Sequence, residues 1–392
     1  MANKKLKKFS RLKPAKLRVR KSYYTFSKEY PAGNIHLKSI RSTGGRSPRA
    51  KLALAVAAFV LLTALSYFTV SLALNISYKE PTTASQTEKP GKPFISTDSV
   101  KALYMPYNKL GDEKYIRNFI RQIKWKNCNS VVIDFKTRQG KLAFTSLDKY
   151  AIKGKCALYD NDTVRKAIDL FTESDINIIA GIYCFEDSAV AKAVTSISVK
   201  YMDTKVNWLD TAGNGWLNPC SKRSQNYIAN IIGELNEMGI KGFILKSAHF
   251  PDASNASGAS YPGIRVYKNE HDVLVQFVTN IKKSLPRDCF VLLSQDSLTV
   301  SSNRNNLYYG NMTSTKIDGL AIDTYKRSKD YVVDKKTDFV SMLSLFESLK
   351  NKCGKKHFVA VINMEEYSGS YLRHIRKAGY ENYILYDKNG DY

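Results

Sequence analysis

From residue 100 onward, short apolar runs alternate with longer segments in which apolar residues recur every three or four positions. The short runs predict buried strands, and the longer segments predict amphipathic helices. We expect strands at 100–106, 130–135, 176–183, 242–246, 289–294, 317–323, 357–363 and 382–387. The helices expected between them lie at 112–126, 161–174, 221–239, 267–285, 301–314, 336–352 and 365–379.

This alternation predicts an α/β domain over residues 98–392, namely a (β/α)8 TIM barrel without a helix after its last strand. Continuous apolar strands are typical of sheets whose faces are covered by helices. A doubly wound open sheet is the alternative, but the sequence has no Gly-rich phosphate loop. Locally, Asn161 or Asp162 is expected to cap the second helix, and Gly239 to end the third in a left-handed conformation.

Ahead of this domain, no charged residue occurs between Lys51 and Lys79. About 20 apolar residues span a bilayer as a helix, so we predict a transmembrane helix at 52–78. A signal peptide cleaved after "SLA" at 71–73 is the alternative, but the length of the basic leader and of the apolar run favours an uncleaved anchor. Residues 79–97 are rich in Pro, Thr, Ser and Lys, which is typical of an extended linker.

Charge decides the expected orientation. Residues 1–51 hold 16 Lys and Arg side chains and one acid, Glu29, within a net charge of +26 for the whole chain. The positive-inside rule keeps such a tail in the cytoplasm and places residues 98–392 outside the cell membrane. The tail could also bind nucleic acid or ribosomes. We favour attraction to anionic lipid of the bilayer, about 1 kcal/mol per basic residue, and expect no nucleic acid.

All six cysteines lie on the expected outward side, at positions 128, 156, 184, 220, 289 and 353. Their spacing contains no Cys-x-x-Cys pair, so it gives little support for a zinc site. Disulfides are plausible outside the cell, and buried free thiols are an equally good interpretation. No motif for a cofactor is present, and we predict neither a metal nor a cofactor.

Polar side chains follow the ends of the predicted strands, where the active sites of TIM barrels lie. They are Asp134, Lys136, Glu186, Asp187, Lys246, His249, Asp296, Asp323, Tyr325, Asn363, Glu365 and Asp387. Two carboxyl groups are what glycoside hydrolysis generally needs. Aromatic residues that could stack on sugars lie in or beside the same loops, at Tyr183, Trp208, Trp216, Tyr261 and Tyr325. Helix caps, ion pairs and loop packing are the competing explanations for these residues.

Three stretches carry a resemblance to a known family: "NSVVIDFKTRQGKLAF", "INIIAGIYCFEDSAVAK" and "GWLNPCSKRSQNYIANIIGELNEMGIKGFILKSAHFP". Over residues 99–387 the chain resembles the bacterial "putative glycosyl hydrolase domain" family, which implies a glycosidase-like TIM barrel. Asp134, Lys136, Asp187 and Asp296 match the family pattern.

The chain departs from that family where its catalytic pair is expected. After the fourth strand the family reads F-D-Y-V-R-F-P, whereas this chain reads "LKSAHFP". The family's aspartate therefore falls on Lys246 and its arginine on His249. An arginine of the third strand falls on Gly181, and the acidic run after the second strand is replaced by "TRQG". We predict that Lys246 pairs with Asp134 or Asp296 and fills the site.

These observations leave three functional hypotheses. The first is a hydrolase of envelope or extracellular polysaccharide, with Asp296 as general acid and Glu186 or Glu365 as nucleophile or base. The second is a degenerate barrel that only binds glycans. Its expected binding residues are Asp134, Lys136, Asp187, Lys246, His249, Trp216, Asp323 and Tyr325. The third is a Schiff-base enzyme, in which an apolar pocket would lower the pKa of Lys246.

Overall fold

The computed structural model describes Leu62 and residues 99–301, 307–324, 339–364, 369–387, 389 and 390. The chain divides into two compact units, Met1–Glu88 and Lys89–Tyr392, and nearly all described residues belong to the second. Within the described residues, no helix combines the length and the apolar character that crossing a membrane requires. The predicted span at 52–78 lies outside the described residues except for Leu62.

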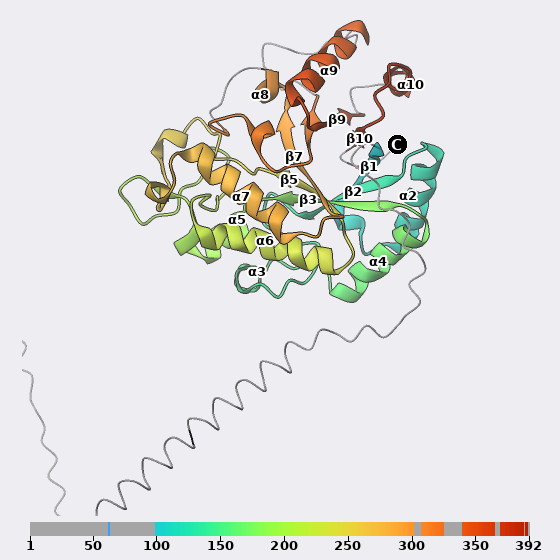
Figure 1. The fold of residues 1–392 in the computed structure, drawn as a ribbon. Coiled ribbons are helices and arrows are strands. Elements are labelled where there is room, and N and C mark those ends of the chain that lie inside the picture. The colour runs from blue at the N-terminus through green and yellow to red at the C-terminus, as the bar shows by residue number, and fades with distance from the viewer. Residues whose placement is uncertain are drawn as a thin grey trace, which may run out of the picture. The chain divides into compact units, whose positions relative to one another are not determined.

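Eight parallel strands form a closed barrel, which confirms the predicted (β/α)8 class (Figure 1). They are β1 (Lys101–Met105), β2 (Ser130–Lys136), β3 (Asn177–Tyr183), β5 (Gly242–Lys246), β7 (Phe290–Asp296), β8 (Gly319–Asp323), β9 (His357–Asn363) and β10 (Tyr383–Tyr386). Each strand pairs with the next one in this series, and β10 closes the barrel against β1. All carboxyl ends of the strands therefore meet at one face of the barrel.

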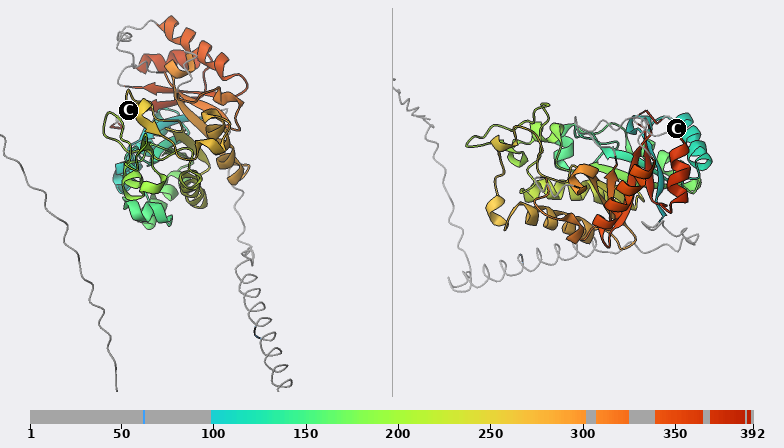
Figure 2. Two further views of the ribbon diagram at one scale, coloured as in Figure 1. Left: turned by 90° about the vertical axis from the view of Figure 1, so that its left-hand side faces the viewer. Right: turned by 90° about the horizontal axis from the view of Figure 1, so that it is seen from above.

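Helices surround the strands, as the two further views in Figure 2 show. They are α2 (Glu113–Trp125), α3 (Lys149–Gly154), α4 (Asn161–Glu173), α5 (Ser188–Ala193), α6 (Lys222–Glu237), α7 (Glu270–Ser284), α8 (Ser297–Ser301), α9 (Phe339–Cys353) and α10 (Gly369–Lys377). The sequence reading did not predict α3 and α5. The helix expected at 301–314 is wrong over its described part, which contains the end of α8 and a 3-10 turn at Met312–Ser314.

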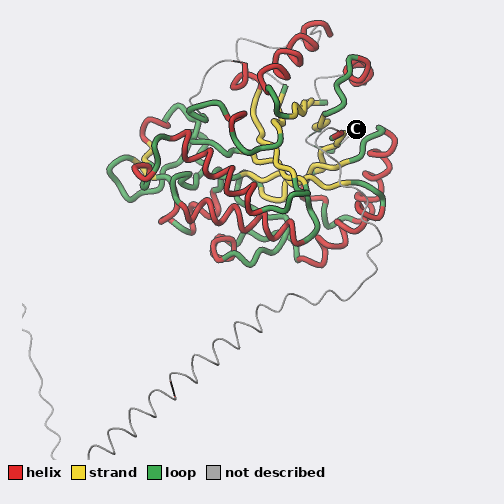
Figure 3. Tube along the Cα trace, in the orientation of Figure 1, coloured by secondary structure: helices red, strands yellow, loops and turns green. Residues whose placement is uncertain are grey.

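A small antiparallel sheet lies outside the barrel and was also not predicted. It joins β4 (Lys200–Tyr201) to β6 (Ala259–Ser260) (Figure 3). Two residues per strand are too few for the alternation of apolar and polar side chains to be recognised.

The start of α4 differs by one residue from the predicted helix cap, and the end of α6 is as predicted. The carboxylate of Asp160 accepts a hydrogen bond from Thr163 N at 2.8 Å, so α4 is capped one residue before the expected Asn161 or Asp162. Gly239 follows α6 with φ of 97°, which confirms the left-handed end of that helix. This φ is open to glycine without steric cost.

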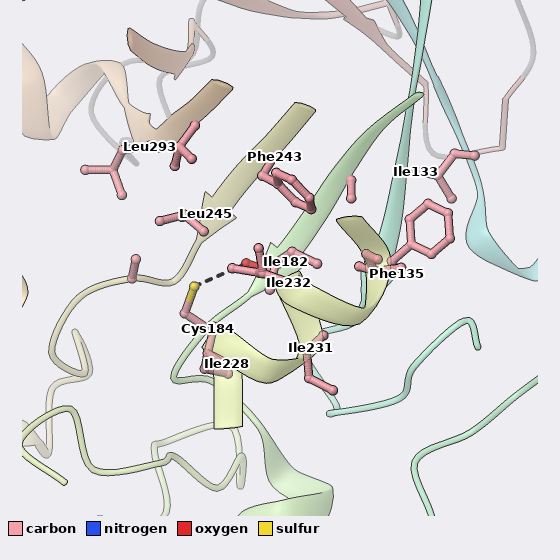
Figure 4. Close-up of a cluster of buried hydrophobic side chains, with 14 of the residues drawn as sticks. Ile133, Phe135, Ile182, Cys184, Ile228, Ile231, Ile232, Phe243, Leu245 and Leu293 are labelled. Atoms are coloured by element: carbon pink, nitrogen blue, oxygen red, sulfur yellow. Dashed lines mark hydrogen bonds between the residues drawn. The ribbon is translucent and has the colours of Figure 1, made fainter. Parts of the chain in front are cut away.

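The strands separate two apolar cores because successive side chains point to opposite faces. One core fills the barrel and includes Ala102, Val132, Ile179, Ile244 and Leu292. The other lies between strands and helices, where Ile133, Phe135, Phe243 and Leu245 pack with Ile228, Ile231 and Ile232 of α6 (Figure 4). The inward positions near the carboxyl ends of β2 and β5 are therefore Asp134 and Lys246, two residues beyond Val132 and Ile244.

A β-bulge interrupts this alternation at the end of β2. Asp134 pairs with Gly181 of β3 and Lys136 pairs with the very next residue, Ile182. A bulge of this kind re-aims the side chain that follows it. The Lys136 ammonium accordingly lies 5.7 Å from the ring centroid of Tyr227 on α6, on the helix side of the strand. Strict alternation would place Asp134 and Lys136 on the same face of β2, whereas the bulge places them in two different clusters.

All six cysteines are free thiols in the structure. Five are buried and Cys128 is partly exposed. Burial raises the pKa of the Cys128, Cys156 and Cys289 thiols, among others, which makes them poor nucleophiles. Of the two sequence interpretations, the structure therefore has the free thiols.

Candidate functional site at the carboxyl face of the barrel

An ion pair occupies the inside of the barrel at its carboxyl end. Lys246 Nζ lies 2.5 Å from Asp134 Oδ1, and the two side chains are 18% and 9% exposed. Tyr104 of β1 donates a hydrogen bond from its hydroxyl to the other carboxylate oxygen, Asp134 Oδ2, at 3.1 Å. Both oxygens of Asp134 are therefore occupied. The predicted pairing of Lys246 with Asp134 is present, and the alternative pairing with Asp296 is not.

Tyrosine rings surround this cation. Lys246 Nζ lies 5.4 Å from the ring centroid of Tyr104 and 5.3 Å from that of Tyr183. The ring of Tyr386, at the end of β10, lies 4.7 Å from Tyr104. Cations are attracted to aromatic faces at such distances. We call Tyr104, Asp134, Tyr183, Lys246 and Tyr386 the barrel-mouth cluster.

This environment keeps Lys246 charged. Burial opposes the charged form, but Asp134 and Tyr183 outweigh it and raise the pKa of the ammonium above its ordinary value. A Schiff-base lysine needs a depressed pKa so that the free amine can attack a carbonyl. The apolar pocket that this hypothesis requires is replaced by a carboxylate and tyrosines, so the Schiff-base hypothesis is wrong.

Gly181 provides the space for the pair. A Cβ atom at this position of β3 would lie 2.0 Å from Asp134 Oδ1 and 3.3 Å from Lys246 Cε. Contacts of 2.0 Å do not occur between real atoms of this kind, so any side chain here would displace the carboxylate. The Lys246–Asp134 pair therefore depends on a glycine in the neighbouring strand.

Replacing Gly181 with alanine is expected to lower the free energy of unfolding by about 1–3 kcal/mol through overpacking. Gly233 of α6 is the matched control, because its added Cβ would meet nothing within 4 Å. Gly233→Ala should raise stability by up to about 1 kcal/mol, since alanine is the better helix former. Urea unfolding of both variants tests this, and equal effects of the two changes would contradict the steric argument.

Glu186 anchors a second cluster beside the first. Its Oε1 lies 3.1 Å from Arg138 Nε, and its Oε2 accepts a hydrogen bond from Ser247 Oγ at 3.0 Å. Ser247 directly follows Lys246 and has a left-handed backbone, with φ of 45°. Arg138 also lies over the Tyr183 ring, at 5.7 Å from its centroid. The Tyr183 ring therefore lies close to the cations of both clusters, Lys246 and Arg138.

Burial raises the pKa of Glu186 above its ordinary value, although Arg138 and Ser247 act in the opposite direction. A carboxyl group with a raised pKa is suited to donate a proton, as the general acid of a glycosidase does. The Glu186 side chain is almost fully buried, however. Its contacts with Arg138 and Ser247 hold the loop after β3 in place, which is a structural role. Only the raised pKa of Glu186 favours a catalytic role.

The raised pKa of Glu186 predicts a pH-dependent effect of Glu186→Gln. The unfolded chain loses this proton near pH 4.3, before the folded chain does. The contribution of the group to stability is therefore complete below that pH and is lost as pH rises through the folded-state pKa. Thermal unfolding should show a Tm advantage of the glutamine variant that grows with pH over this range. A Tm difference that shrinks as pH rises would contradict the raised pKa.

His249 forms an aromatic wall next to Glu186. Its ring lies 5.7 Å from that of Trp216 and 5.5 Å from that of Tyr308, and the Trp216 Nε1–H donates to Asp210 Oδ2 at 3.1 Å. Glu186 and Trp216 also form an isolated β-bridge. Burial lowers the pKa of His249, so its imidazole is neutral at neutral pH. Of the predicted binding residues, Trp216 and His249 are thus brought together near Glu186.

Asp296 is committed to the backbone after β7. Its Oδ1 accepts from Thr299 N at 2.7 Å, and its Oδ2 accepts from the Thr299 hydroxyl at 2.6 Å. This is the pattern of a helix cap, here for α8. Asp323 ends β8 in register with Asp296. The role of Asp296 as general acid stays a prediction, and the observed bonds give it a structural role.

Lys136 and Asp187 form a separate pair that is completely buried. Lys136 Nζ lies 2.8 Å from Asp187 Oδ2, and both side chains are 0% exposed. The ammonium also donates to Tyr183 O at 2.7 Å, and Asp187 Oδ1 caps α5 by accepting from Val190 N at 2.8 Å. Ligand binding by these two residues stays a prediction. Their contacts fix the loop after β3 to the barrel.

Two predicted residues, Tyr325 and Glu365, lie outside the described residues. Among the aromatic candidates, Trp208 is fully buried, with its Nε1–H donating to Asn255 O at 3.3 Å, which fits loop packing. Tyr261 packs its ring edge-on against Phe250 at 4.8 Å. The candidate Tyr183, by contrast, is partly exposed at the barrel mouth, as is Tyr386, which was not a candidate.

Sequence reasoning missed four members of the two clusters, namely Tyr104, Arg138, Ser247 and Tyr386. Inward alternation along β1 and β10 would have found the two tyrosines, since Ala102 and Ile384 are the inward residues two positions before them. Arg138 and Ser247 carried no comparable signal. Their positions follow from loop geometry that residue spacing does not encode.

Within the described residues, no group of three or more His, Cys, Asp or Glu side chains is placed to hold a metal ion.

A sequence profile for a family described as "Putative glycosyl hydrolase domain" matches residues 102–308, more than half of the chain. Curated proteins gave no match. Among solved structures, a hypothetical protein from Ruminiclostridium thermocellum is 21% identical with a TM-score of 0.44, and the alignment covers 49% of this chain and 96% of that chain.

Two solved enzymes are also similar. An exo beta-N-acetylglucosaminidase from Vibrio harveyi is 10% identical with a TM-score of 0.46, covering 67% of this chain and 41% of the enzyme. A trehalose-6-phosphate hydrolase from Bacillus licheniformis is 12% identical with a TM-score of 0.44, covering 68% and 57%. The chain thus spans less than two thirds of the length of either enzyme.

Proposed function

The chain belongs to the "putative glycosyl hydrolase domain" family, and from that premise we propose that it is a glycan-binding barrel whose mouth has lost hydrolytic chemistry. The observation that carries this proposal is the 2.5 Å ion pair between Lys246 and Asp134. The resemblance places the family's aspartate at Lys246, so this strand end offers an ammonium in place of a carboxylate. The neighbouring carboxylate, Asp134, is not free to replace it as a nucleophile, because both of its oxygens are engaged, by Lys246 and Tyr104.

The barrel-mouth cluster supports glycan binding in a second way. Tyr183 and Tyr386 are partly exposed and combine an apolar ring with a hydroxyl. Such amphipathic rings contact sugars through their faces and their hydroxyl groups. The Lys246 ammonium of the same cluster adds a charged hydrogen-bond donor. The ligand we propose is a polysaccharide of the envelope or of the extracellular space.

Binding is tested by retention of the full-length protein on a panel of insoluble and immobilised envelope and extracellular polysaccharides. Tyr183→Ala should weaken binding by about tenfold, which corresponds to about 1.4 kcal/mol. Tyr201→Ala is the matched control, because Tyr201 is an exposed tyrosine on β4 that does not belong to the barrel-mouth cluster. Equal retention of both variants, each with an unchanged Tm, would place any glycan site elsewhere.

We also propose that residues 52–78 anchor the protein in the cell membrane as a single span. The uncharged run between Lys51 and Lys79 and the basic residues before it support this topology, with residues 1–51 in the cytoplasm and the barrel outside. Proteolysis of intact cells is the test. The barrel should be degraded while a tag at the N-terminus is protected, and the reverse pattern would contradict the orientation.

A second candidate function, hydrolysis of the same glycan, is favoured by the raised pKa of Glu186. Here Glu186 would protonate the leaving oxygen, and Asp296 or Glu365 would supply the second carboxylate. Product release should then follow the ionisation of Glu186 and disappear in Glu186→Gln. Release that persists in this variant would remove Glu186 from the reaction.

A further inference from the structure

A basic surface surrounds the point where the chain enters the barrel. The carboxyl ends of α2 and α10 meet there, with Arg376 Nη2 donating to Lys126 O at 2.7 Å. In Figures 1 and 2 these two helices lie on the same side of the barrel. Asn129, three residues after Lys126, donates from Nδ2 to Ser99 O at 2.6 Å. Both helices run antiparallel to their strands, so this surface lies at the end of the barrel opposite the barrel-mouth cluster.

The charges on this surface are not neutralised. Arg121, Lys124, Arg373 and Lys377 are exposed, and Lys126 is partly exposed. None of these five cations forms an ion pair with a carboxylate in the part of the chain that the structure describes. The nearby Glu381 pairs with Lys101 instead. A surface with this excess of cations attracts anions.

An exposed tryptophan lies among these cations. Trp125, the last residue of α2, is 77% exposed, and Lys126 Nζ lies 5.0 Å from its ring centroid. The other two tryptophans of the chain, Trp208 and Trp216, are buried. A water-exposed indole contributes nothing to the core, whereas tryptophan is enriched at the interface between membrane and water.

We propose that the Trp125 patch, formed by Arg121, Lys124, Trp125, Lys126, Arg373 and Lys377, docks on an anionic lipid surface. The cations meet the lipid phosphates, and the indole enters the headgroup region. The chain reaches the barrel at Ser99, beside this patch. The docked barrel therefore turns its mouth away from the lipid and toward extracellular polymer.

Lipid is favoured over another polyanion because of how the chain is connected. This part of the argument rests on the proposed anchor at 52–78. Residues 79–98 extend to roughly 65 Å at most. A linker of this length does not determine which end of the barrel faces the membrane. The Trp125 patch then determines which end faces the lipid.

The test measures the accessibility of Trp125 to acrylamide in the full-length protein reconstituted into vesicles. Phosphatidylcholine vesicles are compared with mixed phosphatidylcholine–phosphatidylglycerol vesicles. Fluorescence quenching should fall several-fold in the mixed vesicles only, and high salt should restore it. Trp125→Phe should leave little quenching in either lipid, which assigns the signal to this residue.

A triple variant, Arg121→Glu, Lys124→Glu and Lys377→Glu, should restore quenching in the mixed vesicles. The control is Lys222→Glu with Arg223→Glu, which adds acidic charge at the opposite end of the barrel, where α6 begins. Equal quenching in both lipids, or equal protection by a soluble oligonucleotide, would overturn the proposal. Flotation with pure phosphatidylcholine vesicles reports on the anchor separately, so a failed anchor and a failed patch give different results.

Discussion

Replacing Lys136 with methionine is expected to lower the free energy of unfolding by about 3–5 kcal/mol, the usual cost of breaking a buried ion pair from one side. The variant would leave the Asp187 carboxylate charged, 0% exposed and without its cation at 2.8 Å. The Tyr183 carbonyl, which the same ammonium contacts, would lose its partner too. Urea unfolding should show a lower midpoint with an unchanged slope.

Two comparisons separate this effect from a general loss of charge. Lys136→Met combined with Asp187→Asn should recover part of the loss, because no unpaired charge then remains and asparagine can still cap α5. Arg117→Ala breaks an exposed pair with Glu113 and should cost no more than about 0.5 kcal/mol. A cost of Lys136→Met as small as that of Arg117→Ala would show that the buried pair does not hold the loop after β3.

Lys246→Met is expected to cost about 3 kcal/mol for the same reason. Among the described residues, Asp134 would keep only the hydroxyl of Tyr104 as a partner in the barrel interior. A double-mutant cycle with Asp134→Asn should give a favourable coupling energy between the two positions, because each single change removes the same interaction. Urea unfolding of the four proteins measures it.

Lys282 provides a matched control outside the barrel mouth. Its Nζ lies 2.6 Å from Asp318 Oδ2, but the two side chains are 22% and 29% exposed. Lys282→Met should therefore cost less than Lys246→Met, since water solvates the carboxylate that is left behind. Equal costs of Lys282→Met and Lys246→Met would contradict the conclusion that the Lys246–Asp134 pair is shielded from water. Additive effects in the Asp134–Lys246 cycle would contradict the conclusion that Lys246 engages the Asp134 carboxylate.

The fold could be predicted because its information is local. All eight strands were placed within one or two residues, since each is an apolar run bounded by an amphipathic helix or a turn. The missed elements were short: α3, α5, α8 and the two-residue strands β4 and β6. Such elements are held by tertiary contacts rather than by periodicity, as when the side chain of Asp148 caps α3.

The site was predicted only in part because its geometry depends on details that spacing does not show. The positions of Asp134 and Lys246 at strand ends indicated a pair, and the structure contains it. The bulge that turns Lys136 away from Asp134 had no sequence signal. Nor could the sequence show that Asp296 uses both carboxylate oxygens on Thr299.

One measurement tests the central claim, that the mouth of this barrel recognises a glycan without cleaving it. The full-length protein is incubated with the polysaccharide that retains it best, and bound protein and newly formed reducing ends are measured in the same samples. We predict saturable binding, with no more reducing ends than heat-inactivated protein gives. Reducing ends that accumulate with the wild-type protein and vanish with Glu186→Gln would show an active hydrolase and contradict the account.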